Sequence, residues 1–234
     1  KHKHTIVGIL LSLSLASCTK KKESKTSLAA NYYQQSLVAA EKNYREALVL
    51  VDKSLNTNPT DRAYALKATL LYQIGKYKES IKLVEKVIEY KKCSKTLKSD
   101  VSNNYACNLL VLGEKKKARK VWEALTEDRF YLSPEVAWFN LGLLIISEIP
   151  DKKKYSKTEI ARVNQAIAYF EKAISCNQDY IDSYYYLSLA LIKLGKLGRA
   201  KQELQQLVGM MNEHEAAKDL LKKVERLIAQ KNKN

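Results

Sequence analysis

Proline, glycine and histidine are scarce in this chain, and each scarcity excludes a class of protein. With 3 Pro and 7 Gly in 234 residues, the chain has too few for an all-β domain full of tight turns or for a disordered Pro/Gly-rich protein. Of the 3 His, two lie at positions 2 and 4, so the body of the sequence carries only His214. A single imidazole cannot build a histidine-based metal centre, and we expect no metal site and no cofactor.

The residues that are abundant favour helix. Ala, Leu, Lys, Glu and Gln dominate the sequence, and these are strong helix formers. The 41 Lys and Arg exceed the 25 Asp and Glu, giving a formal charge of +16. The basic runs at 20–22, 115–117 and 152–154 are separated along the chain. We interpret them as solvated turns and expect neither nucleic acid nor a small-molecule substrate as a partner, although weak attraction to an anionic membrane or wall polymer stays open.

The N-terminus has the layout of an export signal. A basic start at 1–4 precedes a mostly apolar stretch at 5–16, which is shorter than the roughly 20 residues that span a membrane. The letters LASC at 15–18 then resemble a bacterial lipobox. This resemblance implies a signal peptide at 1–17, cleavage before Cys18, and acylation of Cys18, including palmitate. An ordinary signal peptide that happens to contain a cysteine is the alternative.

The residues after Cys18 give two further expectations. Residues 18–27 are polar and charged, and we interpret them as a flexible tether between the lipid and a folded body. Thr19, rather than Asp, follows the cysteine. By resemblance to Gram-negative lipoproteins, this implies a lipid anchor in the outer membrane, facing the periplasm.

A sequence pattern made of a turn, a small residue and an apolar helix recurs along the body of the chain. Its small residues are spaced by 33, 38, 48 and 34 positions, at Ala47, Ser80, Ala118, Ala166 and Ala200. This resembles the tetratricopeptide repeat (TPR), a 34-residue helix–turn–helix unit. The resemblance implies an all-α, right-handed superhelix of about five repeats, forming a domain over 28–231. We place the repeats at about 28–61, 61–94, 99–132, 135–180 and 181–214, with a capping helix at 215–229.

The sequence departs from the repeat pattern in two places. Extra residues lie around 91–98, between the second and third repeats, and an insert at 147–160 separates the two helices of the fourth. Pro150 should end the first of these helices, because proline lacks the N–H and clashes with the preceding turn. A loop of this size is either functional or merely tolerated, and the sequence leaves both open.

In TPR proteins the first helix of each repeat lines a concave groove, and the resemblance implies groove positions here. In the fourth and fifth repeats they form an apolar set that we expect to bind a protein partner: Phe139, Leu143, Ile146, Tyr185, Leu189 and Ile192. Asn104 and Asn140 occupy places where many TPR proteins hold a peptide backbone with an amide. The alternatives are that these residues are core, or that the C-terminal helix fills the groove. Lys193 is the only lysine near these positions, which argues against an acidic C-terminal tail as the ligand.

The cysteines and the rest of the titratable residues give no enzymatic site. Cys93 and Cys107 bracket the link between the second and third repeats, so a disulfide between them is possible in an oxidising compartment. The alternative is that they are small apolar side chains in helix packing. An enzyme would have to use Cys107, Cys176 or His214, and no candidate base stands near any of them. We therefore expect no catalytic residues and no enzyme.

Two stretches in the middle of the chain indicate which group of TPR proteins the sequence resembles. The letters VSNNYACNLL at 101–110 and TEDRFYLSPEVAWFNLG at 126–142 resemble the PilF/PilW/Tgl family of type IV pilus pilotins. That resemblance implies an outer-membrane lipoprotein that binds a secretin subunit and promotes secretin localisation and assembly. The alternative is a general envelope scaffold for peptidoglycan hydrolases or outer-membrane assembly factors.

Overall fold

The computed structural model describes residues 24–90, 92–152 and 154–232. Within these ranges the chain forms helices and no strand, which confirms the all-α class. The helices are α1 (Lys25–Ala40), α2 (Tyr44–Thr57), α3 (Asp61–Gln73), α4 (Tyr77–Glu89), α5 (Lys95–Val111), α6 (Lys115–Thr126), α7 (Pro134–Ser147), α8 (Lys157–Cys176), α9 (Ile181–Lys193), α10 (Leu197–Met210) and α11 (Glu215–Lys231).

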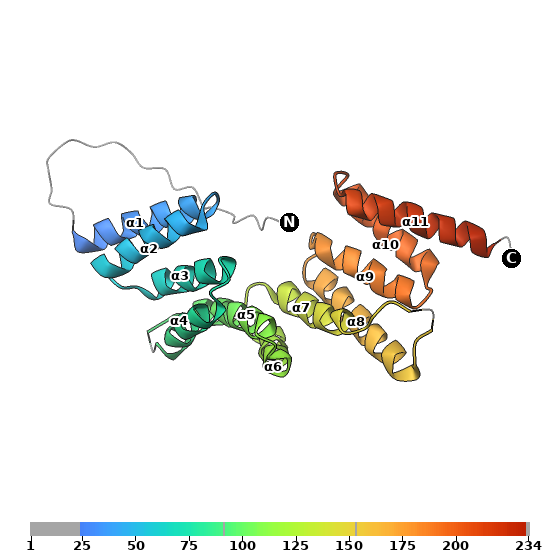
Figure 1. Ribbon diagram of the computed structural model, residues 1–234, viewed down its shortest axis with the longest axis horizontal. Helices are drawn as coiled ribbons and strands as arrows, with labels where there is room; N and C mark the ends of the chain where they lie inside the picture. Colours follow the sequence, from blue (N-terminus) through green and yellow to red (C-terminus); the bar gives the residue numbers. More distant parts are fainter. Residues whose placement is uncertain (1–23, 91, 153, 233–234) are drawn as a thin grey trace.

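The helices follow one another as hairpins along an arch. Each helix packs mainly against the one before it and the one after it, as expected for an array of repeats. Figure 1 shows α1–α4 in one arm of the arch, α9–α11 in the other, and α5–α8 between them. The first helices of neighbouring repeats also touch, as in α3 with α5 and α7 with α9. We call the surface made by these first helices the inner face.

Small residues set the close approach of the two helices within each repeat. The recurring small positions noted in the sequence are all fully buried, at 0% exposure: Ala47, Ser80, Ala118, Ala166 and Ala200. Four of them lie in the first turn of the second helix, whereas Ala166 lies nine residues after the start of α8 at Lys157. A larger side chain at this point would separate the two helices, because protein interiors are already close-packed.

Three of the five turns within repeats depend on a glycine. Gly75, Gly113 and Gly195 have φ angles of +81°, +84° and +68°, a region that other residues rarely adopt. They end α3, α5 and α9, so the second, third and fifth repeats share one short turn. The first repeat turns at Asn43 instead, whose side chain caps α2.

The fourth repeat has a longer connection, as the insert predicted. Helix α7 ends at Ser147, before Pro150, and α8 begins at Lys157, so residues 148–156 link the two helices. We call this segment the insert. A capping box starts α8: the Ser156 hydroxyl accepts from the N–H of Glu159, whose carboxylate accepts from the N–H of Ser156.

Helix boundaries differ from the sequence expectation at several helix ends. Helix α1 begins at Lys25, with Ser24 as its cap, so 25–27 belong to the helical body and not to the expected tether. Helix α5 begins at Lys95, so part of the expected linker at 91–98 is its first turn. Serine caps, Ser24 and Ser94, explain the shifts of α1 and α5, because a hydroxyl can start a helix in a polar segment. Helix α11 extends two residues beyond the expected capping helix.

The expected signal peptide at 1–17 and the acylated Cys18 lie outside the described residues. Among the helices of the described ranges, none combines the length and the apolar character that a membrane span requires.

Candidate partner-binding groove

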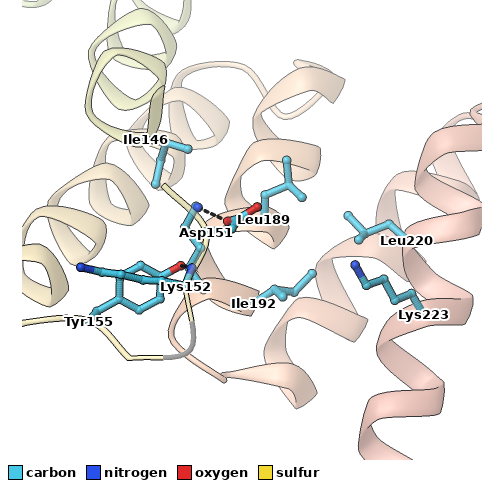
Figure 2. Close-up of a pocket in the computed structure, with 9 residues that line it drawn as sticks. Ile146, Asp151, Lys152, Tyr155, Leu189, Ile192, Leu220 and Lys223 are labelled. Atoms are coloured by element: carbon cyan, nitrogen blue, oxygen red, sulfur yellow. Dashed lines mark hydrogen bonds and ion pairs between the residues drawn. The ribbon is translucent and has the colours of Figure 1, made fainter. Parts of the chain in front are cut away.

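A pocket of about 500 Å³ opens on the inner face near its C-terminal end. It lies between α7, the insert, α9 and α11, as Figure 2 shows. Its lining residues are Ile146, Asp151, Lys152, Tyr155, Leu189, Ile192, Lys193, Leu220 and Lys223. We call this site the inner-face pocket.

Apolar side chains from three helices form the walls of the inner-face pocket. Ile146 comes from the last turn of α7, and Leu189 and Ile192 lie on α9. Figure 2 shows Leu220 of α11 facing Leu189 and Ile192 across the opening. The pocket can therefore take an apolar side chain from outside, because burying such a group removes apolar surface from water on both partners.

Two of the three lysines that line the pocket form ion pairs with carboxylates of the described residues, and the third does not. Lys193, whose side chain is only 11% exposed, donates from Nζ to the Ile149 carbonyl oxygen at 3.0 Å and pairs with the Asp151 carboxylate. Lys152 pairs with Glu159 at 2.7 Å. Lys223 makes no ion pair with any carboxylate of the described residues. One ammonium group therefore faces the pocket uncompensated.

Tyr155 of the insert lies between two of these lysines. Its ring centroid is 5.8 Å from Nζ of Lys152 and 5.9 Å from Nζ of Lys193, within the range of a cation–π contact. Hydrogen bonds from Lys152 and Ser156 lower the pKa of Glu159 to about 2. The insert thus holds its charged groups against α8 and α9 through several weak contacts.

Three of the six expected apolar groove residues line the pocket: Ile146, Leu189 and Ile192. Leu143 is half-buried against the core between α7, α8 and α9. The expectation that Phe139 lies in an open groove is wrong, because Phe139 is only 7% exposed and belongs to that core. Its ring packs against Phe170 of α8 at 5.9 Å and Tyr186 of α9 at 5.4 Å between centroids, so these two helices fill the space that a partner would need.

Tyr185 is half-buried and partly covered by the chain itself. Its ring stacks on His214, with centroids 5.5 Å apart and planes at 27°. His214 caps α11, since its Nδ1 accepts from the N–H of Ala217. The alternative that the C-terminal segment fills the groove therefore holds at Tyr185, whereas the inner-face pocket next to it stays open.

The two asparagines expected to hold a peptide are engaged inside the array. Asn104 donates to the Thr69 hydroxyl at 2.9 Å, and Asn140 donates to the amide oxygen of Asn103 at 3.3 Å. Both contacts join neighbouring repeats. One N–H of each amide therefore helps to fix the stacking of α3, α5 and α7.

Sequence reasoning missed the pocket residues that come from outside the expected groove helices. Those residues are Asp151, Lys152, Tyr155, Leu220 and Lys223. Three lysines line the pocket, so the expectation that Lys193 is the only lysine near the groove is wrong. The signals in the sequence were the basic run at 152–154 and the i, i+3 pair Leu220 and Lys223 on one helix face.

The possible disulfide is not formed. Cys93, Cys107 and Cys176 are free. Cys93 is buried with Ala65 and Val84, whereas Cys107 packs with the cluster around Trp122. Helix packing therefore places both thiols as apolar side chains in separate clusters, which was the other interpretation of the sequence.

The structure shows the surroundings of the three residues considered for an enzyme, Cys107, Cys176 and His214. Burial raises the pKa of the Cys107 thiol to about 11, which keeps it protonated at neutral pH. Cys176 is exposed at the end of α8, and His214 serves as a helix cap. Among the described residues, no cluster of His, Cys, Asp and Glu has the makings of a metal site.

Comparison with known proteins identifies the fold. A profile of the tetratricopeptide repeat matches residues 169–202, which span the end of α8, α9 and the start of α10. None of the curated proteins matches the chain by sequence.

Among solved structures, PilF of Pseudomonas aeruginosa aligns with a TM-score of 0.69 at 18% identity, over 89% of this chain and 87% of that one. PilW, described as a widely conserved type IV pilus biogenesis factor, aligns at 0.63 with 16% identity, over 79% and 78%. YrrB, a TPR protein with an unusual peptide-binding site, aligns at 0.53 with 17% identity, over 83% and 92%. The described chain therefore has the tetratricopeptide-repeat fold, as its sequence predicted.

Proposed function

We propose that the protein is a lipid-anchored, non-enzymatic adaptor that binds a segment of a protein partner on its inner face. The inner-face pocket is the observation that carries this proposal. Ile146, Leu189, Ile192 and Leu220 offer apolar surface around an open space of about 500 Å³. Pockets of this kind accept a few anchoring side chains, which supply most of the affinity of a protein interface.

The more specific proposal is a role in type IV pilus assembly. The similarity of the fold to PilF and PilW over most of both chains supports it, as do the sequence stretches at 101–110 and 126–142. In this role the partner is a secretin subunit, and the protein acts as a pilotin that promotes secretin localisation and assembly. Acylation of Cys18 would hold it in the outer membrane, since several acyl chains anchor far more firmly than one.

Photocrosslinking in living cells tests the partner and the surface together. A photoreactive amino acid at Leu189 lies in the pocket, and one at Lys172 lies on the exposed surface of α8 as a matched control. We expect a secretin subunit in the Leu189 adduct and not in the Lys172 adduct. An adduct with a hydrolase or an assembly factor would replace the pilotin role by a general envelope scaffold. Crosslinking from Lys172 alone would contradict the inner face as the binding surface.

The anchor is tested separately by the Cys18→Ser substitution. We expect the wild-type protein to fractionate with outer membranes after metabolic labelling with palmitate, and the Cys18→Ser variant to lose both the label and the membrane association. A variant that stays in the outer-membrane fraction would contradict the lipid anchor. This result would leave the crosslinking test of the pocket unaffected.

A further inference from the structure

The charges at the inner-face pocket favour one kind of partner segment. Three lysines line it, and the carboxylates of Glu159 and Asp151 pair with two of them, Lys152 and Lys193. Lys223 is left without a carboxylate among the described residues, beside the apolar side chain of Leu220 one helical turn earlier. Figure 2 shows both side chains of α11 directed toward α9 across the opening.

We propose that this pocket binds an acidic side chain, Asp or Glu, of a partner segment that places an apolar side chain directly beside it. The apolar side chain packs between Leu189, Ile192 and Leu220, and the carboxylate pairs with Lys223. This inference rests on the proposed function, because it specifies the chemistry of the segment that the inner face binds. A basic segment is disfavoured, since its charge would meet like charges at close range.

Asp151 is a second carboxylate at the pocket, and it competes with the partner's carboxylate for the positive charge there. Its side chain is 91% exposed, whereas that of Lys193, its ion-pair partner, is 11% exposed. The Ile149 carbonyl oxygen holds the Lys193 ammonium group independently, at 3.0 Å. An exposed carboxylate gains little from such a pair. Loss of the Asp151 charge therefore leaves Lys193 in place and leaves more of the positive charge at the pocket to the carboxylate that pairs with Lys223.

Selection from peptide libraries tests the proposal on the full chain. One library of random dodecapeptides has its C-termini fused to the display particle, and a second has free C-termini. We expect binders from the fused library in which Asp or Glu stands next to Leu, Ile or Phe. Synthetic amidated copies of these peptides then serve as probes in fluorescence polarisation.

Three variants connect the selected peptides to the pocket. Lys223→Gln should weaken binding about fivefold, the equivalent of roughly 1 kcal/mol, whereas Lys222→Gln should change it by less than about twofold. Lys222 is the matched control because it neighbours Lys223 on α11 but pairs with Asp219 and does not line the pocket. Asp151→Asn should tighten binding about two- to fivefold, because it removes the competing carboxylate.

Each contrary outcome has a separate meaning. Peptides that bind and compete with the Leu189 crosslink, but carry no acidic residue, would overturn this inference and leave the proposed function intact. Binders from the free-C-terminus library alone would assign the site to a terminal carboxylate and overturn the side-chain proposal. Equal effects of Lys222→Gln and Lys223→Gln would show a general charge effect, which also overturns it. An absence of binders from both libraries would count against the inference and the peptide-binding function together.

Discussion

The second and fourth repeats are both helical hairpins, but different contacts hold each hairpin together. In the second repeat, the buried Ser80 hydroxyl of α4 donates to the Ala68 carbonyl oxygen of α3 at 2.7 Å and accepts from the amide of Asn108 at 3.1 Å. Polar contacts therefore lock α3, α4 and α5 together. The turn between α3 and α4 is short and needs only Gly75 in its left-handed conformation.

The fourth repeat uses aromatic packing at the corresponding place. Ala166 takes the position of Ser80, and Phe170 lies one turn later, where the second repeat has Val84. The Phe170 ring is fully buried and covers Gly142 of α7. This large apolar contact fixes α7 against α8 without help from a short turn. The connection is then free to lengthen into the insert, which delivers Asp151 and Lys152 to the pocket.

The largest expected effect follows from this aromatic contact. Phe170→Ala should lower the free energy of unfolding by about 3–5 kcal/mol, because it removes the ring and leaves a cavity among α7, α8 and α9. Val84→Ala, at the corresponding position of the second repeat, should cost less, since it removes only two methyl groups. Urea unfolding followed by circular dichroism measures both. Equal losses would show that the two repeats do not differ in the way described.

A smaller loss of stability is expected from a substitution at Gly142, which the Phe170 ring contacts. A Cβ added to Gly142 would lie 2.7 Å from Cε1 of Phe170, so Gly142→Ala should cost about 1–3 kcal/mol through overpacking. Gly198 in α10 is the control, because a Cβ there meets no atom of the described residues within 4 Å. Gly198→Ala should stabilise the protein by up to about 1 kcal/mol, the difference in helix propensity. Destabilisation by both substitutions in equal measure would contradict the steric explanation.

The polar contact of Ser80 in the second repeat should contribute somewhat less to the free energy of unfolding than the contact of Phe170 with Gly142. Ser80→Ala should cost about 1–2 kcal/mol, since it removes the hydroxyl that donates to the Ala68 carbonyl oxygen and leaves the Asn108 amide with only its bond to the Asn104 carbonyl oxygen. Asn108 is fully buried and its amide oxygen has no hydrogen-bond partner within the described residues. The double variant Ser80→Ala with Asn108→Leu should therefore recover part of the loss. A double variant whose loss equals the sum of the two single losses would contradict coupling between these side chains.

The repeat architecture was predictable because it depends on contacts that are close in sequence. The spacing of Ala47, Ser80 and Ala118 marks where two neighbouring helices must approach, and all three are fully buried. The insert was predictable for the same reason, since Pro150 ends a helix locally. Helix ends were less predictable, as at Lys25 and Lys95, where hydroxyl caps extend helices into polar segments.

The pocket was only half predictable because it joins segments far apart in sequence. Leu189 and Ile192 follow from the groove positions that the repeat resemblance implies, but the place of Lys223 at the same pocket as the insert depends on how the fourth and fifth repeats and α11 stack. Phe139 shows the opposite error. Its position on α7 matches a groove position, yet Phe170 and Tyr186 from other helices enclose it. A residue's helical face is encoded locally, whereas the side chains that cover that face are not.

The smallest expected effect concerns the start of α8, where the fourth repeat resumes after the insert. Hydrogen bonds from Lys152 and Ser156 lower the pKa of Glu159 from an ordinary 4.5 to about 2. A lowered pKa means that the ionised carboxylate stabilises the folded state. This stabilisation is fully present above the unfolded pKa and is lost as the pH falls from about 4.5 through about 2. The second repeat, which turns through Gly75, has no such cap at α4.

The urea midpoint of Glu159→Gln should therefore lie below that of the wild type at pH 6, and the difference should vanish as the pH approaches 2. Glu213→Gln is the control, because Glu213 is exposed and its side chain forms no ion pair or cap within the described ranges. Its midpoint should follow the wild type across the same pH range. A difference for Glu159→Gln that persists unchanged at pH 2 would mean that the amide disturbs packing, and the ionised cap would not be what holds the insert to α8.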